Sequence, residues 1–402
     1  MSQEPTRARG HLPTLIACFL HFDFSFMIWV LLGSLGIFVA ESAGLSDAQK
    51  GWMVAIPILS GSLLRVPVGL LADRIGGKRV GVALLALLMV PLAIGWLGPV
   101  NTGSLFSLGL LLGIGGASFA VALPLASRWY PPERQGLAMG VAAAGNSGTV
   151  ITHLLAPRLA ESFGWKAVFG LAMIPLALVL VCFALLARES PRAASAIHDR
   201  GPAMWRRVLS APDLWWLCLF YAVTFGGYVG LGSFLPLLFR DQFQVEPVTA
   251  GQLAAAVTLA GSISRPIGGI VADRVGGAKL LGLLLFAVGG TYAIASGLPT
   301  LTATVVMLLV GMVFLGMGNG AVFQIVPRRF PREVGVVTGV IGAVGGLGGF
   351  LVPILLGTLK GNTGSFAAGF VGLALLALTA AVRLRTLCRA SADWRGSWGA
   401  EA

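Results

Sequence analysis

The chain has 402 residues, of which 56% are hydrophobic and 11% are charged, and its mean hydropathy is +0.87. A soluble domain of this size cannot bury so much apolar surface, so the composition excludes a soluble globular protein and predicts an all-α membrane protein with many spanning helices. The net charge of +12 raises the possibility of a nucleic-acid partner. The distribution of the charges, described below, predicts no nucleic acid.

Twelve apolar runs are long enough to cross a bilayer, because a hydrocarbon core of roughly 30 Å needs about 20 apolar residues per helix. We expect spans near residues 12–40, 51–73, 79–98, 103–128, 135–158, 165–187, 212–239, 248–273, 278–297, 301–327, 334–358 and 363–386. The only long polar connection follows the sixth span. The chain is therefore expected to form two pseudo-symmetric six-helix bundles, 1–187 and 212–390, joined by a cytoplasmic linker at 188–211 and followed by a cytoplasmic tail at 391–402.

The basic residues predict the orientation. When the loops are assigned alternately to the two sides, most of the 28 Lys and Arg residues fall on the side that carries both termini and the linker. The other side receives Lys50, Arg158, Lys166, Arg240 and Lys360. We expect the protein to lie in the cytoplasmic (inner) membrane. By the positive-inside rule, both of its termini then face the cytoplasm. This topology accounts for the net positive charge without nucleic acid.

Patterns typical of enzymes and metal sites are not found. The four cysteines, Cys18, Cys182, Cys218 and Cys388, stand singly and show neither metal-ligand nor redox spacing, so we interpret them as small apolar residues. The sequence holds no His-x-x-Glu-His, Gly-x-Ser-x-Gly or phosphate-loop motif. We expect neither an enzyme nor a cofactor or metal, and we expect no soluble domain of the kind that a sensor needs.

Two stretches 200 residues apart are almost the same, residues 64–78 (LRVPVGLLADRIGGK) and residues 264–279 (SRPIGGIVADRVGGAK). The repeat extends to the segments 130–136 and 330–335, each of which leads into a glycine-rich span. Two halves in the same orientation, with a substrate site between them near the bilayer midplane, form a known transporter architecture.

These residues resemble a known family. The segments 69–79 and 269–279 are similar to the repeated loop signature of the major facilitator superfamily, and Gly145-Asn146-Ser147-Gly148 together with the glycine run 342–349 resembles the two signatures of its nitrate/nitrite porters. The resemblance covers nearly the whole chain. It implies a secondary active transporter that moves nitrate or nitrite by alternating access, with Arg65 and Arg265 in the positions of the paired substrate-binding arginines.

Both arginines lie deep in apolar spans. Arg65 is about 21 Å into its helix when counted from Gly51 at 1.5 Å per residue, and a charge there costs roughly 2.5–3.5 kcal/mol on the insertion scale. One alternative is an ion pair with Asp23, the only deep acid, but one carboxylate cannot neutralise two arginines. We favour a bound monovalent anion, because the guanidinium fork matches a flat oxyanion.

The resemblance implies further substrate-site residues. Asn146 has a side-chain amide that can donate to an anion oxygen, and Phe119, Tyr221 and Phe225 match the aromatic residues that sandwich the substrate, although each aromatic taken alone suits core packing better. Asn319 and Gln324 are weaker candidates, since polar side chains in spans often bridge helices.

Two sets of residues are expected to serve the conformational change. Gly145, Gly148, Gly345 and Gly346 let the fifth and eleventh spans approach their partners, and we interpret them as gating contacts. The turns at Asp73, Arg74, Asp273 and Arg274 are expected to latch the cytoplasmic side; an interpretation as ordinary topology signals is equally open.

His21 and Asp23 are candidates for proton coupling, because an ionisable pair within a span is a default proton relay. The alternatives are an ion pair from Asp23 to an arginine, or a position near the cytoplasmic interface. An anion that enters against an inside-negative potential needs protons, whereas a nitrate/nitrite exchanger needs no titratable group. The pair favours proton-coupled uptake, with exchange as the alternative.

The cargo has one competing interpretation. Paired arginines can also hold an organic carboxylate or a phosphate ester. A larger substrate calls for more polar residues than the glycine and aromatic lining found here, which suggests a small cavity. We therefore expect a small anion, possible proton partners, the lipid bilayer and a monomer.

Overall fold

The computed structural model describes residues 10–130, 141–142, 144–191, 202–297, 300–330, 333–391 and 394. These residues are mostly helical and include no strand, which confirms the prediction of an all-α protein. Eleven helical segments among them are long and apolar enough to cross a membrane. The remaining expected span, near 135–158, falls partly outside the described residues.

The N-terminal half is built from interrupted and continuous helices. The first expected span is divided into three helices, and the fourth and fifth expected spans each contain a short 3₁₀ segment at a glycine-rich site. The elements are α1 (Leu12–Trp29), α2 (Leu31–Ser34), α3 (Gly36–Ala43), α4 (Asp47–Ile75), α5 (Gly77–Leu97), α6 (Thr102–Leu112), η1 (Gly113–Ser118), α7 (Phe119–Ser127), η2 (Ala144–Ser147), α9 (Gly148–Phe163) and α10 (Trp165–Leu186).

The C-terminal half has longer and more regular helices. A short helix lies in the expected linker, and six continuous helices follow it. The elements are α11 (Pro202–Leu209), α12 (Pro212–Phe243), α13 (Pro247–Val275), α14 (Gly277–Ala295), α15 (Leu301–Arg329), α16 (Val334–Thr363) and α17 (Ala367–Ala390).

The internal repeat is visible in the backbone. Every positive φ angle among the described residues belongs to one of three pairs whose members are 200 residues apart. The pairs are Gly44 and Gln244 (φ 60° and 54°), Gly76 and Gly276 (100° and 94°), and Gly164 and Gly364 (82° and 74°). L-residues with side chains rarely adopt this conformation, so glycine fills five of these six turn positions. The same turns end equivalent helices in both halves, as the sequence repeat predicts.

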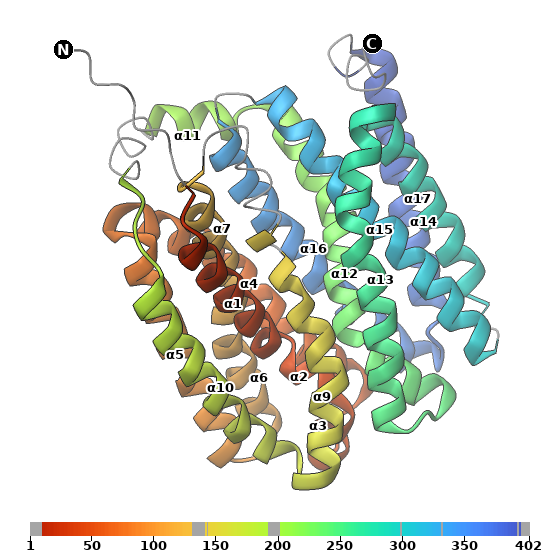
Figure 1. The fold of residues 1–402 in the computed structure, drawn as a ribbon. Helices are drawn as coiled ribbons and strands as arrows, with labels where there is room; N and C mark the ends of the chain where they lie inside the picture. The colour runs from red at the N-terminus through yellow and green to blue at the C-terminus, as the bar shows by residue number, and fades with distance from the viewer. Residues whose placement is uncertain are drawn as a thin grey trace.

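The two ends of the bundle differ. Helix α1 begins and α17 ends at the same end, uppermost in Figure 1, where α11 also lies. We call this the terminal end. The halves meet mainly where α4 packs along α16 and where α9 packs along α13, and α12 also contacts α2 and α3.

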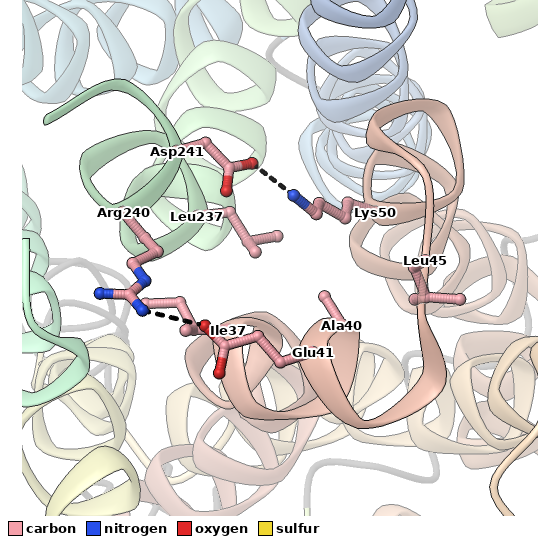
Figure 2. Close-up of a pocket in the computed structure, with 8 residues that line it drawn as sticks. All are labelled: Ile37, Ala40, Glu41, Leu45, Lys50, Leu237, Arg240 and Asp241. Carbon is pink, nitrogen blue, oxygen red and sulfur yellow. Dashed lines mark hydrogen bonds and ion pairs between the residues drawn. The ribbon is translucent and has the colours of Figure 1, made fainter. Parts of the chain in front are cut away.

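At the opposite end, ion pairs join the two halves. Lys50 of α4 lies 2.8 Å from Asp241 of α12, and Arg240 of α12 lies 3.2 Å from Glu41 of α3. Figure 2 shows both pairs around a cavity of about 200 Å³. We call this the ion-pair end. Neither pair was expected from the sequence, which placed these residues in loops and helix ends.

Close backbone packing continues inward from the ion-pair end. A methyl group on Gly51 would lie 2.5 Å from the carbonyl oxygen of Pro353, and one on Gly33 would lie 2.6 Å from that of Ser233. Toward the terminal end, Gly339 of α16 is exposed with open space beside it. The described residues therefore close the halves against one another at the ion-pair end.

Candidate functional site

Arg65 of α4 lies at the centre of the interface between the halves and is only 3% exposed. Its Nε donates to the carbonyl oxygen of Gly116 at 3.1 Å, and its Nη1 donates to that of Gly342 at 2.6 Å. Gly116 belongs to the same half, whereas Gly342 is in α16 of the other half. The buried Nη2 has no hydrogen-bond partner. Both N–H groups of this nitrogen are thus left available to a ligand.

Aromatic rings surround the Arg65 guanidinium. Its central carbon lies 5.5 Å from the ring centre of Trp29 and 5.3 Å from those of Phe119 and Phe225. Such contacts stabilise a desolvated cation by about 2 kcal/mol or more each. Phe119 and Phe225 were predicted site residues and the structure brings both to Arg65, whereas Trp29 was missed.

Arg265 of α13 approaches the same aromatic group from the C-terminal half. Its Nη2 donates to the hydroxyl of Tyr221 at 3.2 Å, and its guanidinium carbon lies 6.0 Å from the ring centre of Phe225 and 5.8 Å from that of Phe323. Tyr221 and Phe225 are stacked at 4.9 Å with parallel rings. Phe225 thus contacts both arginines.

The two guanidinium groups have no acidic partner. Among the described residues, neither Arg65 nor Arg265 forms an ion pair with a carboxylate. The alternative of an ion pair with Asp23 is not found, since the Asp23 carboxylate instead accepts a hydrogen bond of 2.9 Å from Ser147. Two positive charges in a low-dielectric site are therefore uncompensated, and a small bound anion can neutralise part of this charge.

The glycines of α16 allow this helix to pack close to α4 and to Tyr221 at the site. A methyl group on Gly345 would lie 2.3 Å from the Tyr221 ring, and one on Gly346 would lie 1.9 Å from Ser62 Oγ. Ser62 is on α4 in the other half, whereas Tyr221 is in the same half as Gly345. Gly346 therefore lies directly on the interface between the halves.

The glycines of the fifth span face a different partner. A methyl group on Gly145 would lie 2.8 Å from the carbonyl oxygen of Phe19, and one on Gly148 would lie 2.2 Å from that of Asp23. Both contacts are with α1 of the same half. Of the four glycines predicted as gating contacts, only Gly346 has its closest neighbour in the opposite half.

Asn146 does not contact either arginine by a hydrogen bond. Its amide Nδ2 donates to the hydroxyl of Tyr228 at 2.9 Å, across the interface between the halves. Asn319 is buried and its Oδ1 has no partner. The Gln324 amide lies between Gly277 and Arg328, and its oxygen accepts from Arg328 when the amide is assigned in the flipped orientation. Gln324 therefore belongs to the region near the ends of α13 and α15.

The two proton-coupling candidates occupy separate environments. His21 is fully buried, with its Nε2 at 3.2 Å from the carbonyl oxygen of Gly81 and its ring 4.6 Å from that of Phe183. These partners belong to α5 and α10 of the same half. Asp23 is also buried, but its partner Ser147 adjoins Asn146. Asp23 is therefore connected to the candidate site and His21 is not.

The predicted cytoplasmic latch residues lie at the terminal end. Asp73 forms an ion pair of 2.5 Å with Arg128, which is in the same half. Within the described residues, Arg74, Asp273 and Arg274 are exposed and form no ion pair. In the part of the chain that the structure describes, the ion pairs that cross between the two six-helix halves are those of the ion-pair end.

A model of the Major Facilitator Superfamily matches residues 17–353, which is most of the chain. The chain belongs to this superfamily. It is thus a transporter rather than an enzyme, and the resemblance noted in its loop signatures is confirmed.

Curated relatives narrow the assignment to the nitrate/nitrite porter family. The chain is 34% identical over 361 residues to the "Nitrite extrusion protein" of Bacillus subtilis, with 89% of each chain covered. It is 33% identical to the "Probable nitrate/nitrite transporter NarK2" of Mycobacterium tuberculosis (93% of this chain, 95% of the relative) and 32% identical to the "Probable nitrate/nitrite antiporter NarK1" of Thermus thermophilus (89% and 87%). These relatives show that the chain is a member of that family.

A solved structure shows the same fold. A bacterial homologue of the human lysosomal transporter Spinster, in an inward-facing and occupied conformation, superimposes with a TM-score of 0.75 at 19% identity, covering 94% of this chain and 97% of that one. The expected arrangement of two six-helix bundles agrees with this superfamily fold.

Proposed function

We propose that this superfamily member carries nitrate and nitrite across the cytoplasmic membrane by alternating access, with one anion held between Arg65 and Arg265. The relatives whose names include nitrate or nitrite support the choice of cargo. Asn146, Phe119, Tyr221 and Phe225 complete the proposed site. Both arginines come from one chain, so a monomer suffices.

The observation that carries this proposal is the pair of uncompensated arginines around one ring. Arg65 and Arg265 come from equivalent positions of the two halves, and Phe225 lies within 5.3 and 6.0 Å of them. The unpartnered Nη2 of Arg65 supplies an N–H donor to a ligand. A flat monovalent oxyanion can accept from both forks at once, and it would draw the two halves together through its charge.

The orientation follows from the positive-inside rule. Most of the described basic residues lie at the terminal end, so we assign that end to the cytoplasm and the ion-pair end to the outside. The structure is closed at the ion-pair end by the pairs Lys50–Asp241 and Arg240–Glu41. In this assignment the protein is closed toward the outside.

Substitution of Arg65 by lysine tests the proposal. Lysine keeps the positive charge but loses the planar fork, so we expect nitrate uptake into proteoliposomes to fall by at least tenfold. Arg158→Lys is the matched control, because Arg158 is exposed and bonds only to its own helix at Leu154. Normal nitrate uptake by Arg65→Lys would refute the central claim.

Competition between anions tests the cargo separately. Nitrite and nitrate should displace one another from the wild-type protein, whereas formate and phosphate should not. Displacement by an organic carboxylate or a phosphate ester, with no effect of nitrate, would favour the alternative cargo.

The coupling has two candidates. Exchange is favoured by the site itself, because the partners of Arg65 and Arg265 are carbonyl oxygens, aromatic rings and the Tyr221 hydroxyl. Proton symport through Asp23 is the second candidate, because Asp23 is bonded to Ser147 next to Asn146. Uptake that ignores a pH gradient and requires internal nitrite supports exchange; uptake driven by the gradient without internal nitrite supports symport.

A further inference from the structure

The hydroxyl of Tyr228 is a junction between the two halves. It accepts a hydrogen bond of 2.9 Å from Asn146 Nδ2 of the N-terminal half. On its own side it lies 2.6 Å from Ser262 Oγ and 3.5 Å from the carbonyl oxygen of Thr258, both in α13. Thr149 of α9 in the N-terminal half also lies within hydrogen-bonding reach of this hydroxyl, so polar partners from both halves surround it.

The position of this hydroxyl is fixed by packing. The Tyr228 side chain is 3% exposed, and a methyl group on Gly261 of α13 would lie 2.7 Å from its ring. The ring thus fills the space that a glycine leaves open. Asn146 is also buried, at 7% exposed, so water competes little for their hydrogen bond.

The junction adjoins the candidate anion site on the side of the ion-pair end. Tyr221, Phe225 and Tyr228 follow one another at spacings of four and three residues, which places them on one face of α12. Tyr228 lies about 10 Å along the helix from Tyr221, toward Asp241. The hydrogen bond to Asn146 therefore crosses between the halves where they are closed.

We propose that Tyr228 is a positioning residue that orients Asn146 for the anion only while the ion-pair end is closed. The inference rests on the proposed function, in which Asn146 donates to the substrate. An amide nitrogen carries two N–H groups, and the bond to Tyr228 uses one and fixes the direction of the other. When the halves part at the ion-pair end, Asn146 and Tyr228 separate and this orientation is lost.

A consequence is that the anion binds more tightly to the conformation that is closed at the ion-pair end. A ligand shifts a conformational equilibrium by its difference in affinity for the two states. Anion binding would then favour closure of the ion-pair end, and Tyr228 would link occupancy of the site to that closure.

Tyr228→Phe tests this idea, because it removes the hydroxyl and keeps the ring. Tyr292→Phe is the matched control, since the Tyr292 hydroxyl is buried without a hydrogen-bond partner, in the core of the C-terminal half. Nitrite/nitrate exchange is measured in oriented proteoliposomes, and KM is determined from each side of the membrane. For Tyr228→Phe we expect KM measured from the side of the terminal end to rise roughly fivefold, because the loss of one typical hydrogen bond weakens affinity by about this factor. We expect KM measured from the other side to stay unchanged.

Ser262→Ala provides a second variant that removes the neighbouring hydroxyl from the other side of the junction. It should shift KM in the same direction and on the same side, by a smaller factor. An equal change of KM on both sides in Tyr228→Phe would indicate a purely structural role and overturn the inference. So would wild-type KM values on both sides for Tyr228→Phe and Ser262→Ala.

The experiment separates this inference from the proposed function. If the wild-type protein and Tyr292→Phe exchange neither nitrate nor nitrite, the proposed function fails. If both exchange these anions and Tyr228→Phe matches them on each side, the proposed function stands and the role of Tyr228 is refuted.

Discussion

Arg65 of the N-terminal half donates a 2.6 Å hydrogen bond from its Nη1 to the backbone carbonyl of Gly342 in the C-terminal half. The bond joins the two halves at the proposed anion site without neutralising the arginine. An acid at this place would satisfy the charge permanently and compete with any anion. A carbonyl oxygen positions the guanidinium and leaves its net charge for the substrate. Arg65 can therefore bind the anion and also hold the two halves together.

The neighbouring turn of α16 should tolerate no added side chain. In Gly346→Ala the new methyl group would lie 1.9 Å from Ser62 Oγ and 2.9 Å from Ser62 Cβ, so rotation of the serine cannot relieve the clash and α4 must move. Overpacking of this kind costs about 1–3 kcal/mol. We expect exchange to fall by roughly tenfold, measured as nitrite/nitrate exchange at equal protein density. Gly339→Ala is the control, because it meets open space on the same helix.

A compensating change at Ser62 should relieve the clash. Ser62→Gly removes both atoms that the new methyl group would meet, so the double variant Ser62→Gly with Gly346→Ala should regain much of the exchange rate. Failure of the double variant to recover, with Ser62→Gly alone active, would show that Gly346 matters for a reason other than its contact with α4.

The fold was predictable because its signals are local or repeated. Span length follows from hydropathy, and the duplicated turns around Gly76 and Gly276 indicated two equivalent halves before any contact was known. The paired arginines also stood out, because a charge inside an apolar run is costly wherever it points. The structure brings the arginines and their shared ring Phe225 together, and their role in holding a substrate stays a prediction.

The partners of these residues were not predictable, because they depend on side-chain direction between distant segments. Trp29 and Phe323 contact the arginines but look like ordinary core aromatics in the sequence. No sequence pattern pointed to Tyr228, since its proposed role depends on a hydroxyl in the C-terminal half that accepts a hydrogen bond from Asn146 in the N-terminal half. Equally, nothing in the sequence paired Lys50 with Asp241 across 191 positions.

The ion pairs at the ion-pair end should favour the closed state there. Lys50 and Asp241 each keep 16% of the side chain exposed, and Lys50 also pairs with Asp47 of its own helix at 3.2 Å. Loss of Asp241 leaves Lys50 this acidic partner, so we expect a cost of about 1 kcal/mol. Asp241→Asn should therefore shift the population toward opening at this end by about fivefold. The measurement is the labelling rate of a cysteine introduced at Ala40, which lines the cavity of Figure 2, in a cysteine-free background.

Charge reversal is the control for the ion pair. Lys50→Asp combined with Asp241→Lys should restore slow labelling, whereas each single reversal should accelerate it. Similar labelling rates in all four proteins would mean that the pair contributes nothing to closure.

Asp23 and His21 should respond differently to substitution. If protons drive uptake, Asp23→Asn should abolish uptake driven by a pH gradient and leave nitrite/nitrate exchange intact, because the amide still bonds to Ser147 but cannot carry a proton. His21→Gln should keep the response to the gradient, since His21 packs against Gly81 and Phe183 away from the arginines. The reverse pattern would assign coupling to His21, and a gradient response in neither wild type nor variants would leave exchange as the mechanism.

Phe225 should be needed most when the site is empty. Its ring lies beside both guanidinium groups and offsets part of their repulsion by cation–π contact, each worth about 0.5–2 kcal/mol. Phe225→Leu should therefore lower the melting temperature of the purified protein in anion-free buffer more than in saturating nitrate, because the bound anion then supplies the missing negative potential. Phe234→Leu, on the same helix but packed against Phe366, should lower it equally with and without nitrate. An equal loss in both conditions for Phe225→Leu would show that the ring serves only as packing.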